Sequence, residues 1–488
     1  MGRVIQDTYY NKKHVRKSIF WIVGIILLGS VMVYGLNSQL SRSFYFFIVL
    51  AYLLLSKDKV LTAAIFFVLL LYPIQLFYSS PYNWAIPITS SVGIRYYSVF
   101  IIGYAFKYLV SVKFKTELIK DHFKPYYKVF VLYFLLLILI GFLFGYNKTA
   151  YYNLFRSVVV LSLFIVFTRI MNEKQMLQFN RIIFAFTIIL AIVGIVEILL
   201  KGAILETLVF GRTTRRHLIS EEGIMRVGVG GRLMFYSIII ATYYLISGKG
   251  QFRKDYLWFI IVLSYVTIFN TASRGWIIAS SFVIVISVLY YIKNIILKPR
   301  VFIIGLAIIF VVTIFLPETI KQNLVYAYER VETLEEVAAG DMTGGGTIGR
   351  WTERGPRALT RFDESPIFGF GFSKVSAEYY DHHVGNHSLL ITSGILGLSI
   401  IWLTVISIVY YIFKLESKSK YFKSFFVFGI AIMALMLIHS SNEITISFFG
   451  TPVDAAILWV IIFNNINASI DSVIKCKYEL PKLSHIGQ

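Results

Sequence analysis

The sequence predicts an all-α, polytopic membrane protein with about 12–14 transmembrane helices and a structured external loop. Of its 488 residues, 57% are apolar and only 15% are charged, whereas a soluble globular chain carries roughly 25% charged residues. The apolar residues come in blocks of about 15 to 22, the pattern of a multi-spanning membrane protein. These blocks exclude a soluble enzyme, a coiled coil and a disordered chain, and the single cysteine, Cys476, excludes a disulfide scaffold.

The predicted spans follow from a length of about 20 apolar residues for one crossing. They lie near residues 18–36, 43–55, 59–78, 92–111, 125–145, 153–171, 181–200, 232–247, 256–270, 275–292, 301–317, 388–413, 422–440 and 453–470. Basic residues from Arg3 to Lys17 precede the first span, so we expect a cytoplasmic N-terminus. No small-residue cleavage site follows this span, which favours an anchor over a cleaved signal peptide. An even number of spans then places both termini in the cytoplasm.

The formal net charge of +21 fits this orientation. If the connections alternate from a cytoplasmic N-terminus, most Lys and Arg fall in the inward connections, and nearly all of the net positive charge lies on that side. A strongly basic chain can also indicate nucleic-acid binding, but the orientation explains the charge without it. We therefore expect contacts with membrane lipids and no nucleic-acid partner.

Two outward connections are longer than the others, and they divide the chain. We expect N-terminal membrane helices at 1–317 with a basic outer loop at 201–231, a large external loop with helices at 318–387, and C-terminal membrane helices with a short cytoplasmic tail at 388–488. Within the external loop, residues 325–340 have amphipathic helical spacing, and a glycine run separates them from a second segment.

Arginine is concentrated in the outward connections, against the inside-positive tendency. Its planar fork suits bidentate capture of phosphate. The outward arginines are Arg212, Arg215, Arg216, Arg226, Arg232, Arg274, Arg350, Arg354, Arg357 and Arg361. The last four form one stripe if their segment is a single helix, although Pro356 also allows a helix that begins at that proline. For Arg354, Arg357 and Arg361 the alternative is a solvated face, paired with neighbouring Glu and Asp.

Histidines form a second concentration, just before the span at 388–413. His382, His383 and His387 follow Asp381 here, and a histidine at the mouth of a helical bundle can act as a general base near neutral pH. A structural role in the loop is the alternative. His383 and His387 also have the spacing of zinc ligands, but the HExxH glutamate and a further ligand cluster are missing, so we predict no metal site.

Three motifs occur in a fixed order along 206–413. They are TASRGW at 271–276, GRWTERGPRALTRFDESPIFGFGFSKV at 349–375 and NHSLLITSGILGL at 386–398. Together they resemble the O-antigen ligase and O-antigen polymerase superfamily of bacterial envelope glycosyltransferases. The Ser-Arg-Gly, Pro-x-x-Gly-x-Gly and His-to-Gly-x-x-Gly signatures carry the resemblance, which extends to the first six spans only in general character.

The resemblance implies a GT-C-like membrane fold and a metal-independent glycosyltransferase without a cofactor. It would act at the external, periplasmic side of the bacterial cytoplasmic membrane, with an undecaprenyl-pyrophosphate-linked glycan as donor and a glycan or the lipid A core as acceptor. Arg274 and Arg350 would bind the pyrophosphate, and Arg226 would belong to the same cationic site. From the outward arginines we add Arg215 and Arg354 as candidates for pyrophosphate binding.

The catalytic histidine implied by the resemblance has two candidates. His383 lies eleven residues before Gly394, the spacing usual in the family, but Val384 follows it. His387 is followed by Ser388, as the family motif allows, but lies only seven residues before that glycine. We favour His387 for its Asn-His-Ser setting at the helix start and keep His383 as the alternative.

Three functions remain open at this point. The motifs do not separate a polymerase of O-antigen or exopolysaccharide repeats from a ligase that transfers the glycan to the lipid A core, and we favour the polymerase. A transporter of lipid-linked sugars is the rival from another class. Transporters place their polar site near the membrane midplane, often within repeated halves, whereas the ionisable residues of this chain cluster at one surface.

Overall fold

The computed structural model describes the chain in segments. These are residues 2–36, 38–71, 85–87, 93–111, 121–200, 203–208, 231–248, 250–270, 273–291, 353–381, 383–418, 424–441, 445–447 and 453–483, with 321, 322, 325, 328 and 422. Helices make up nearly all of them, which confirms the predicted all-α, polytopic membrane class. Two short strands, β1 (Ala85–Pro87) and β2 (Gly93–Arg95), pair antiparallel.

The helices follow the hydropathy of the sequence. They are α1 (Gly2–Gly29), η1 (Ser30–Gly35), α2 (Gln39–Leu55), α3 (Lys59–Leu71), α4 (Tyr96–Ser111), α5 (Lys124–Phe144), α6 (Lys148–Val166), η3 (Phe167–Arg169), α7 (Glu173–Leu199), α8 (Ala203–Leu208), α9 (Gly231–Ser247), α10 (Lys254–Asn270), α11 (Arg274–Tyr291), α14 (Gly355–Ala358), η7 (Phe362–Glu364), α15 (Lys374–Tyr379), α16 (Gly385–Lys418), α17 (Phe426–Ser441) and α18 (Val453–Leu483). Among the described residues, five helices are long and apolar enough to cross a membrane, and shorter apolar helices accompany them.

Each predicted span except 301–317, which lies outside the described residues, contains a described helix. The prediction was wrong at the start of the span over 92–111. Residues 93–95 form β2 instead, and α4 begins at Tyr96. Pairing with β1 satisfies the backbone there, and Gly93 is a poor helix former, so the apolar run alone overestimates the helix.

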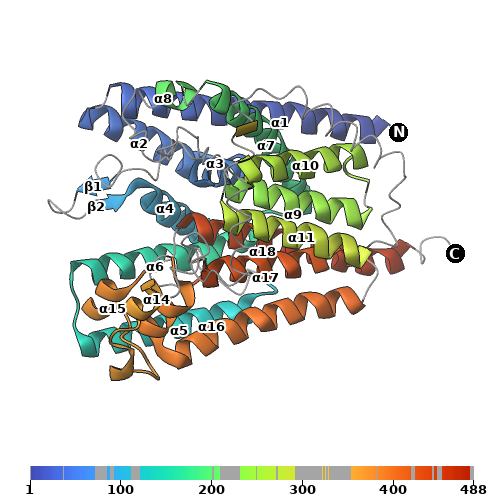
Figure 1. Cartoon of the computed structure of the whole chain (residues 1–488). Helices are drawn as coiled ribbons and strands as arrows, with labels where there is room; N and C mark the ends of the chain where they lie inside the picture. Colours follow the sequence, from blue (N-terminus) through green and yellow to red (C-terminus); the bar gives the residue numbers. More distant parts are fainter. Residues whose placement is uncertain are drawn as a thin grey trace.

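The ends of the chain and the loop motifs lie at opposite ends of the helix bundle (Figure 1). The N-terminal end of α1 and the C-terminal end of α18 lie at one end, whereas α14, α15 and the start of α16 gather at the other. This arrangement agrees with an even number of crossings. The assignment of the first end to the cytoplasm stays a prediction.

The core of the bundle is apolar, with a small buried polar network around α18. Asn465 of α18 donates hydrogen bonds to the hydroxyl of Tyr236 at 2.7 Å and to its own helix, and it accepts one from Asn180 of α7 at 3.1 Å. The Tyr236 hydroxyl in turn donates to Asn180 at 2.7 Å. Such interhelical hydrogen bonds stabilise helix packing where the membrane offers no hydrophobic driving force.

Helix α16 is broken at Gly394. This residue has φ of 64° and ψ of −168°, which interrupts the helical hydrogen bonds one turn before Gly397. The left-handed region suits glycine and strains other residues. The break exposes backbone carbonyls before Gly394 and amides after it, and a buried break of this kind needs partners from elsewhere in the chain.

The Pro-x-x-Gly-x-Gly loop supplies these partners. The amides of Ile395 and Leu396 donate to the carbonyls of Pro366 and Ile367 at 2.9 and 3.0 Å, respectively. In return the amides of Phe370 and Gly371 donate to the carbonyls of Ile391 and Thr392, at 3.0 and 2.7 Å. The loop therefore completes the hydrogen bonding of the broken helix.

Close backbone approach explains the glycines of this loop. A Cβ on Gly369 would lie 2.5 Å from the amide nitrogens of Ser393 and Gly394, and Gly371 packs equally closely on Gly141 and Leu137 of α5. The loop is thereby inserted between α16 and α5. The second and third sequence motifs are thus one packing unit, which fixes the position of α14 relative to the first turn of α16.

Candidate functional site

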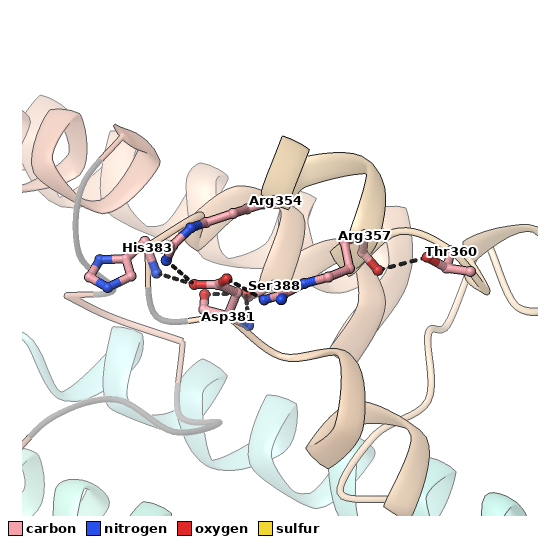
Figure 2. Close-up of polar contacts among 6 residues, drawn as sticks. All are labelled: Arg354, Arg357, Thr360, Asp381, His383 and Ser388. Atoms are coloured by element: carbon pink, nitrogen blue, oxygen red, sulfur yellow. Dashed lines mark hydrogen bonds and ion pairs between the residues drawn. The ribbon is translucent and has the colours of Figure 1, made fainter. Parts of the chain in front are cut away.

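A buried carboxylate joins α14 to the start of α16 (Figure 2). Asp381 precedes α16, and its side chain is 7% exposed. Its Oδ2 accepts a hydrogen bond from Nη2 of Arg357 at 2.8 Å, and its Oδ1 lies 3.6 Å from Nη1 of Arg354. One carboxylate therefore binds two arginines.

The short helix α14 presents these arginines from one turn. Arg354 occupies the N-cap position, and Pro356 lies in the first turn, where its missing amide costs no hydrogen bond. After the turn, the Thr360 hydroxyl donates to the carbonyl of Arg357 at 2.8 Å. The helix begins near Pro356, the second arrangement that the sequence allows. Of Arg354, Arg357 and Arg361, the three arginines of this segment that the structure describes, the first two lie on Asp381.

The same Asp381 also fixes the turn that leads into α16. Its Oδ1 accepts a hydrogen bond from the amide of His383 at 2.9 Å. The Ser388 hydroxyl accepts from the Asp381 amide at 3.1 Å and donates to the Asp381 carbonyl at 2.7 Å. Ser388 is the residue after His387, so the serine of the His-Ser pair holds the first turn of α16 onto the carboxylate-bearing residue.

The charge of Asp381 is favoured by its surroundings. Burial alone raises the pKa of this carboxyl, but the hydrogen bond from the His383 amide and the electrostatic interactions with Arg354, His383 and Arg357 outweigh it, so that the pKa lies below its usual range. Asp381 is therefore ionised at neutral pH, and the two arginines keep their partner.

His387 lies against the start of α14. A Cβ added to Gly355, the residue after Arg354, would lie 2.8 Å from Nε2 of His387. The imidazole is partly buried, and its Nδ1 has no hydrogen-bond partner in the described part of the chain. The structure therefore places the His387 ring, with a buried Nδ1, next to the turn that carries the two arginines.

A second histidine, His439 of α17, supports the start of α16 from the other side. A Cβ on Gly385 would overlap the carbonyl oxygen of His439 and would lie 3.0 Å from its Nε2. The imidazole is fully buried, and its Nδ1 accepts hydrogen bonds from the amides of Thr445 and Ile446 at 3.1 and 3.4 Å. Sequence reasoning missed His439 because it lies inside an apolar run, where a histidine is usually a core residue.

Arg361 lies on a solvated face and pairs with a neighbouring acidic residue, as the alternative interpretation of the sequence predicts. Its guanidinium donates two hydrogen bonds to Glu364 and lies over the ring of Phe370, 5.5 Å from the centroid. The pair is exposed, with 36% and 50% of the two side chains accessible. Arg361 therefore stays away from Asp381.

The structure does not describe the side chains of the other predicted site residues. Arg274 begins α11, but its side chain is outside the described residues, and so are Arg215, Arg226 and Arg350. Their convergence on the site stays a prediction. The described part of the predicted site is thus His383, His387 and Arg354, and the structure adds Arg357 and Asp381 to them.

The described residues form no cluster of three or more His, Cys, Asp or Glu side chains suited to a metal ion. His383 and His387 have different contacts. The His383 backbone amide donates a hydrogen bond to Asp381, whereas the His387 ring lies against Gly355.

Comparison with known proteins adds the family. Residues 259–401 match the family model described as O-antigen ligase. The matched segment runs from α10 to the middle of α16 and includes all three motifs, which confirms the resemblance to the O-antigen ligase and polymerase superfamily. The match points to glycosyltransferase activity of this ligase or polymerase type. No curated protein matches the chain.

Proposed function

We propose, from the O-antigen ligase domain at residues 259–401, that this membrane protein is a metal-independent glycosyltransferase that polymerises O-antigen or exopolysaccharide repeats. Its donor would be an undecaprenyl-pyrophosphate-linked glycan at the external face of the cytoplasmic membrane. One observation carries the proposal: the His387 ring packs against Gly355, next to the two arginines that Asp381 holds.

The proposed reaction transfers the glycan from pyrophosphate to an acceptor hydroxyl. His387 takes the proton of that hydroxyl, whose oxygen attacks the anomeric carbon of the donor. The bond between this carbon and the phosphate oxygen breaks, and undecaprenyl pyrophosphate leaves with the bonding electrons. A positioned base of this kind contributes about 10²–10⁴-fold.

Arginines stabilise the negative charge that grows on the leaving pyrophosphate. Arg354 lies in the turn that contacts His387. We propose that four further arginines complete the cationic site: Arg274, Arg350, Arg226 and Arg215. Preorganised cations of this kind stabilise a leaving anion without a metal ion. The acceptor in this scheme is a sugar hydroxyl.

Turnover of lipid-linked repeats by the purified protein in detergent tests the proposal. We expect His387→Ala to lower kcat by about 10²–10⁴-fold. His383→Ala should have a much smaller effect, because it keeps the hydrogen bond from the backbone amide of residue 383 to Asp381. Glu364→Gln serves as the control because it lies in the exposed pair with Arg361.

Three results would contradict this proposal. Full activity of His387→Ala would exclude the base, and loss of activity only in His383→Ala would move this role to the other histidine. Transport of the lipid-linked sugar without any turnover would identify a transporter.

A ligase is the second candidate, because the description of the matched family names an O-antigen ligase. The glycan would then be transferred to the lipid A core, with the same residues in the same roles. A deletion strain separates the two functions. Single-repeat capping of the core indicates a lost polymerase, whereas long chains that remain on the lipid carrier indicate a lost ligase.

A further inference from the structure

We infer that Asp381 is a positioning residue, which holds Arg354 and Arg357 ready for the donor pyrophosphate and keeps them in register with His387. The inference rests on the proposed function of this site, and it assigns roles to Asp381 and Arg357, which the sequence motifs leave without one. It starts from the bonding of a single carboxylate (Figure 2).

Asp381 uses both carboxylate oxygens, and its partners come from two elements. Oδ1 accepts a hydrogen bond from the backbone amide of His383 and lies near Arg354. Oδ2 accepts a hydrogen bond from Arg357. The carboxylate is 7% exposed, but the side chains of Arg354 and Arg357 are 43% and 68% exposed. The anchor is therefore buried, and the two guanidiniums remain accessible to a ligand.

Each arginine keeps most of its hydrogen-bond capacity. A guanidinium carries five N–H donors, and in the described part of the chain each of these two contacts Asp381 through one terminal nitrogen. Glu353, the acidic neighbour of Arg354, is exposed and forms no ion pair with it among the described contacts. One positive charge and a row of unused donors thus remain for a ligand that is anionic and rich in acceptor oxygens.

The two sides of this contact differ in exposure. Two accessible arginines share one enclosed carboxylate. The carboxylate is therefore fixed in position, and the guanidinium groups remain open to a ligand. Holding the fork of an arginine in advance lowers the entropy that ligand binding costs.

The same residue links the arginine pair to the base. The backbone amide and carbonyl of Asp381 both bond to the Ser388 hydroxyl, and Ser388 directly follows His387. A shift of Asp381 would therefore move the two arginines and the first turn of α16 together. A phosphate oxygen bound by the pair is in this way kept at a fixed place relative to the imidazole.

A double-mutant cycle on the full-length protein tests whether Asp381 acts through the arginines. Two quantities are measured for each variant: kcat/KM with a lipid-linked repeat, and the Kd for undecaprenyl pyrophosphate in detergent. We expect Asp381→Asn to lower kcat/KM and to raise the Kd by about tenfold each, the effect of losing one charge-assisted hydrogen bond. In the Arg354→Ala/Arg357→Ala background, Asp381→Asn should change neither quantity further.

Two variants keep the cycle interpretable. Glu364→Gln neutralises the other carboxylate that pairs with an arginine in this region and should leave both quantities unchanged. Asp381→Glu keeps the negative charge and adds one methylene group, so it should recover most of the binding, and it remains informative if Asp381→Asn fails to accumulate.

Equal losses from Asp381→Asn in both backgrounds would overturn the inference, because Asp381 would then act independently of the arginines. An unchanged Kd in Asp381→Asn would also overturn it, and so would a Kd in Asp381→Glu raised by tenfold or more, because that variant keeps the charge. The proposed function fails separately: wild-type protein that binds undecaprenyl pyrophosphate in an Asp381-dependent way, but turns over no lipid-linked repeat, would retain the positioning role and lose the glycosyltransferase.

Discussion

Two arginine–carboxylate contacts lie in one short stretch of the chain and differ in what surrounds them. Arg357 donates to Asp381, which is 7% exposed and comes from the entry to a different helix. Arg361, four residues later, donates to Glu364, which is 50% exposed and lies in the next turn. The first contact joins two elements through a buried anchor, whereas the second closes a local turn in water.

This difference separates arginines that sequence spacing treats alike. An exposed pair close in sequence contributes about 0–1 kcal/mol because water screens it. A pair with one enclosed partner fixes the position of a distant element, and removing the cation leaves a buried charge. We therefore propose a functional role for Arg354 and Arg357, and we interpret Arg361 as part of a solvent-exposed surface pair.

The largest effect is expected where the loop that carries both contacts meets the broken helix. Gly369→Ala places a Cβ 2.5 Å from backbone nitrogens of α16, at a residue with φ of 66°. Overpacking and backbone strain together should lower the free energy of unfolding by about 3 kcal/mol. Because the loop sets the position of α14, activity should fall by about 100-fold.

Gly250→Ala is the matched control for this substitution. Gly250 has φ of 64°, but nothing lies within 4 Å of the position that its Cβ would take. The change therefore introduces the same backbone strain, about 1–2 kcal/mol, without the collision, in the connection between α9 and α10 and outside the three motifs. Chemical unfolding in detergent and a turnover assay compare the two, and equal losses of activity would contradict the role of the loop.

A second test removes the cation from each contact. Arg357→Ala leaves the Asp381 carboxylate buried with one ionic partner fewer and should cost about 2 kcal/mol of stability. Arg357→Lys keeps the charge but loses the planar fork, so it should recover only part of this loss. Arg361→Ala should cost much less, because water screens its exposed pair with Glu364. A larger loss in Arg361→Ala than in Arg357→Ala would reverse the comparison.

The pH dependence sharpens the comparison further. The pKa of Asp381 is lowered in the folded protein, so its contribution to stability is complete above the unfolded pKa and is lost as the pH falls through the folded value. The difference in unfolding midpoint between wild type and Asp381→Asn should therefore be constant from about pH 8 to pH 5. It should shrink below about pH 4, the ordinary value for an aspartate. A difference that already changes near neutral pH would assign the effect to another group.

The membrane class and most of the helices were predictable because hydropathy reports burial in lipid directly. The exception at 93–95 shows the limit, since strand pairing depends on a partner that hydropathy does not reveal. The individual motifs were also visible in the sequence. Their contact was not, because the bonds between Pro366 or Ile367 and α16 arise only when the helix breaks at Gly394.

The site was predictable by residue type and not by contact. Both His387 and Arg354 were expected, but a stripe at 350, 354, 357 and 361 gave no reason to separate Arg357 from Arg361. That separation depends on Asp381, which approaches from the other side of a folded loop. His439 was missed for the same reason, since its contact with Gly385 is a property of how α17 packs on α16.

The smallest effect is expected for the exposed pair, and salt is the way to measure it. The hydrogen bonds from Arg361 lower the pKa of Glu364, but both groups are in contact with water. Glu364→Gln should therefore change the unfolding midpoint slightly at low ionic strength and not at all in about 1 M salt, where charges are screened beyond about 3 Å. Asp381→Asn should keep most of its effect at the same salt concentration, because enclosed charges are screened far less. If salt removes both effects equally, the Asp381 carboxylate is exposed to solvent in solution, and the two contacts are the same kind of surface pair.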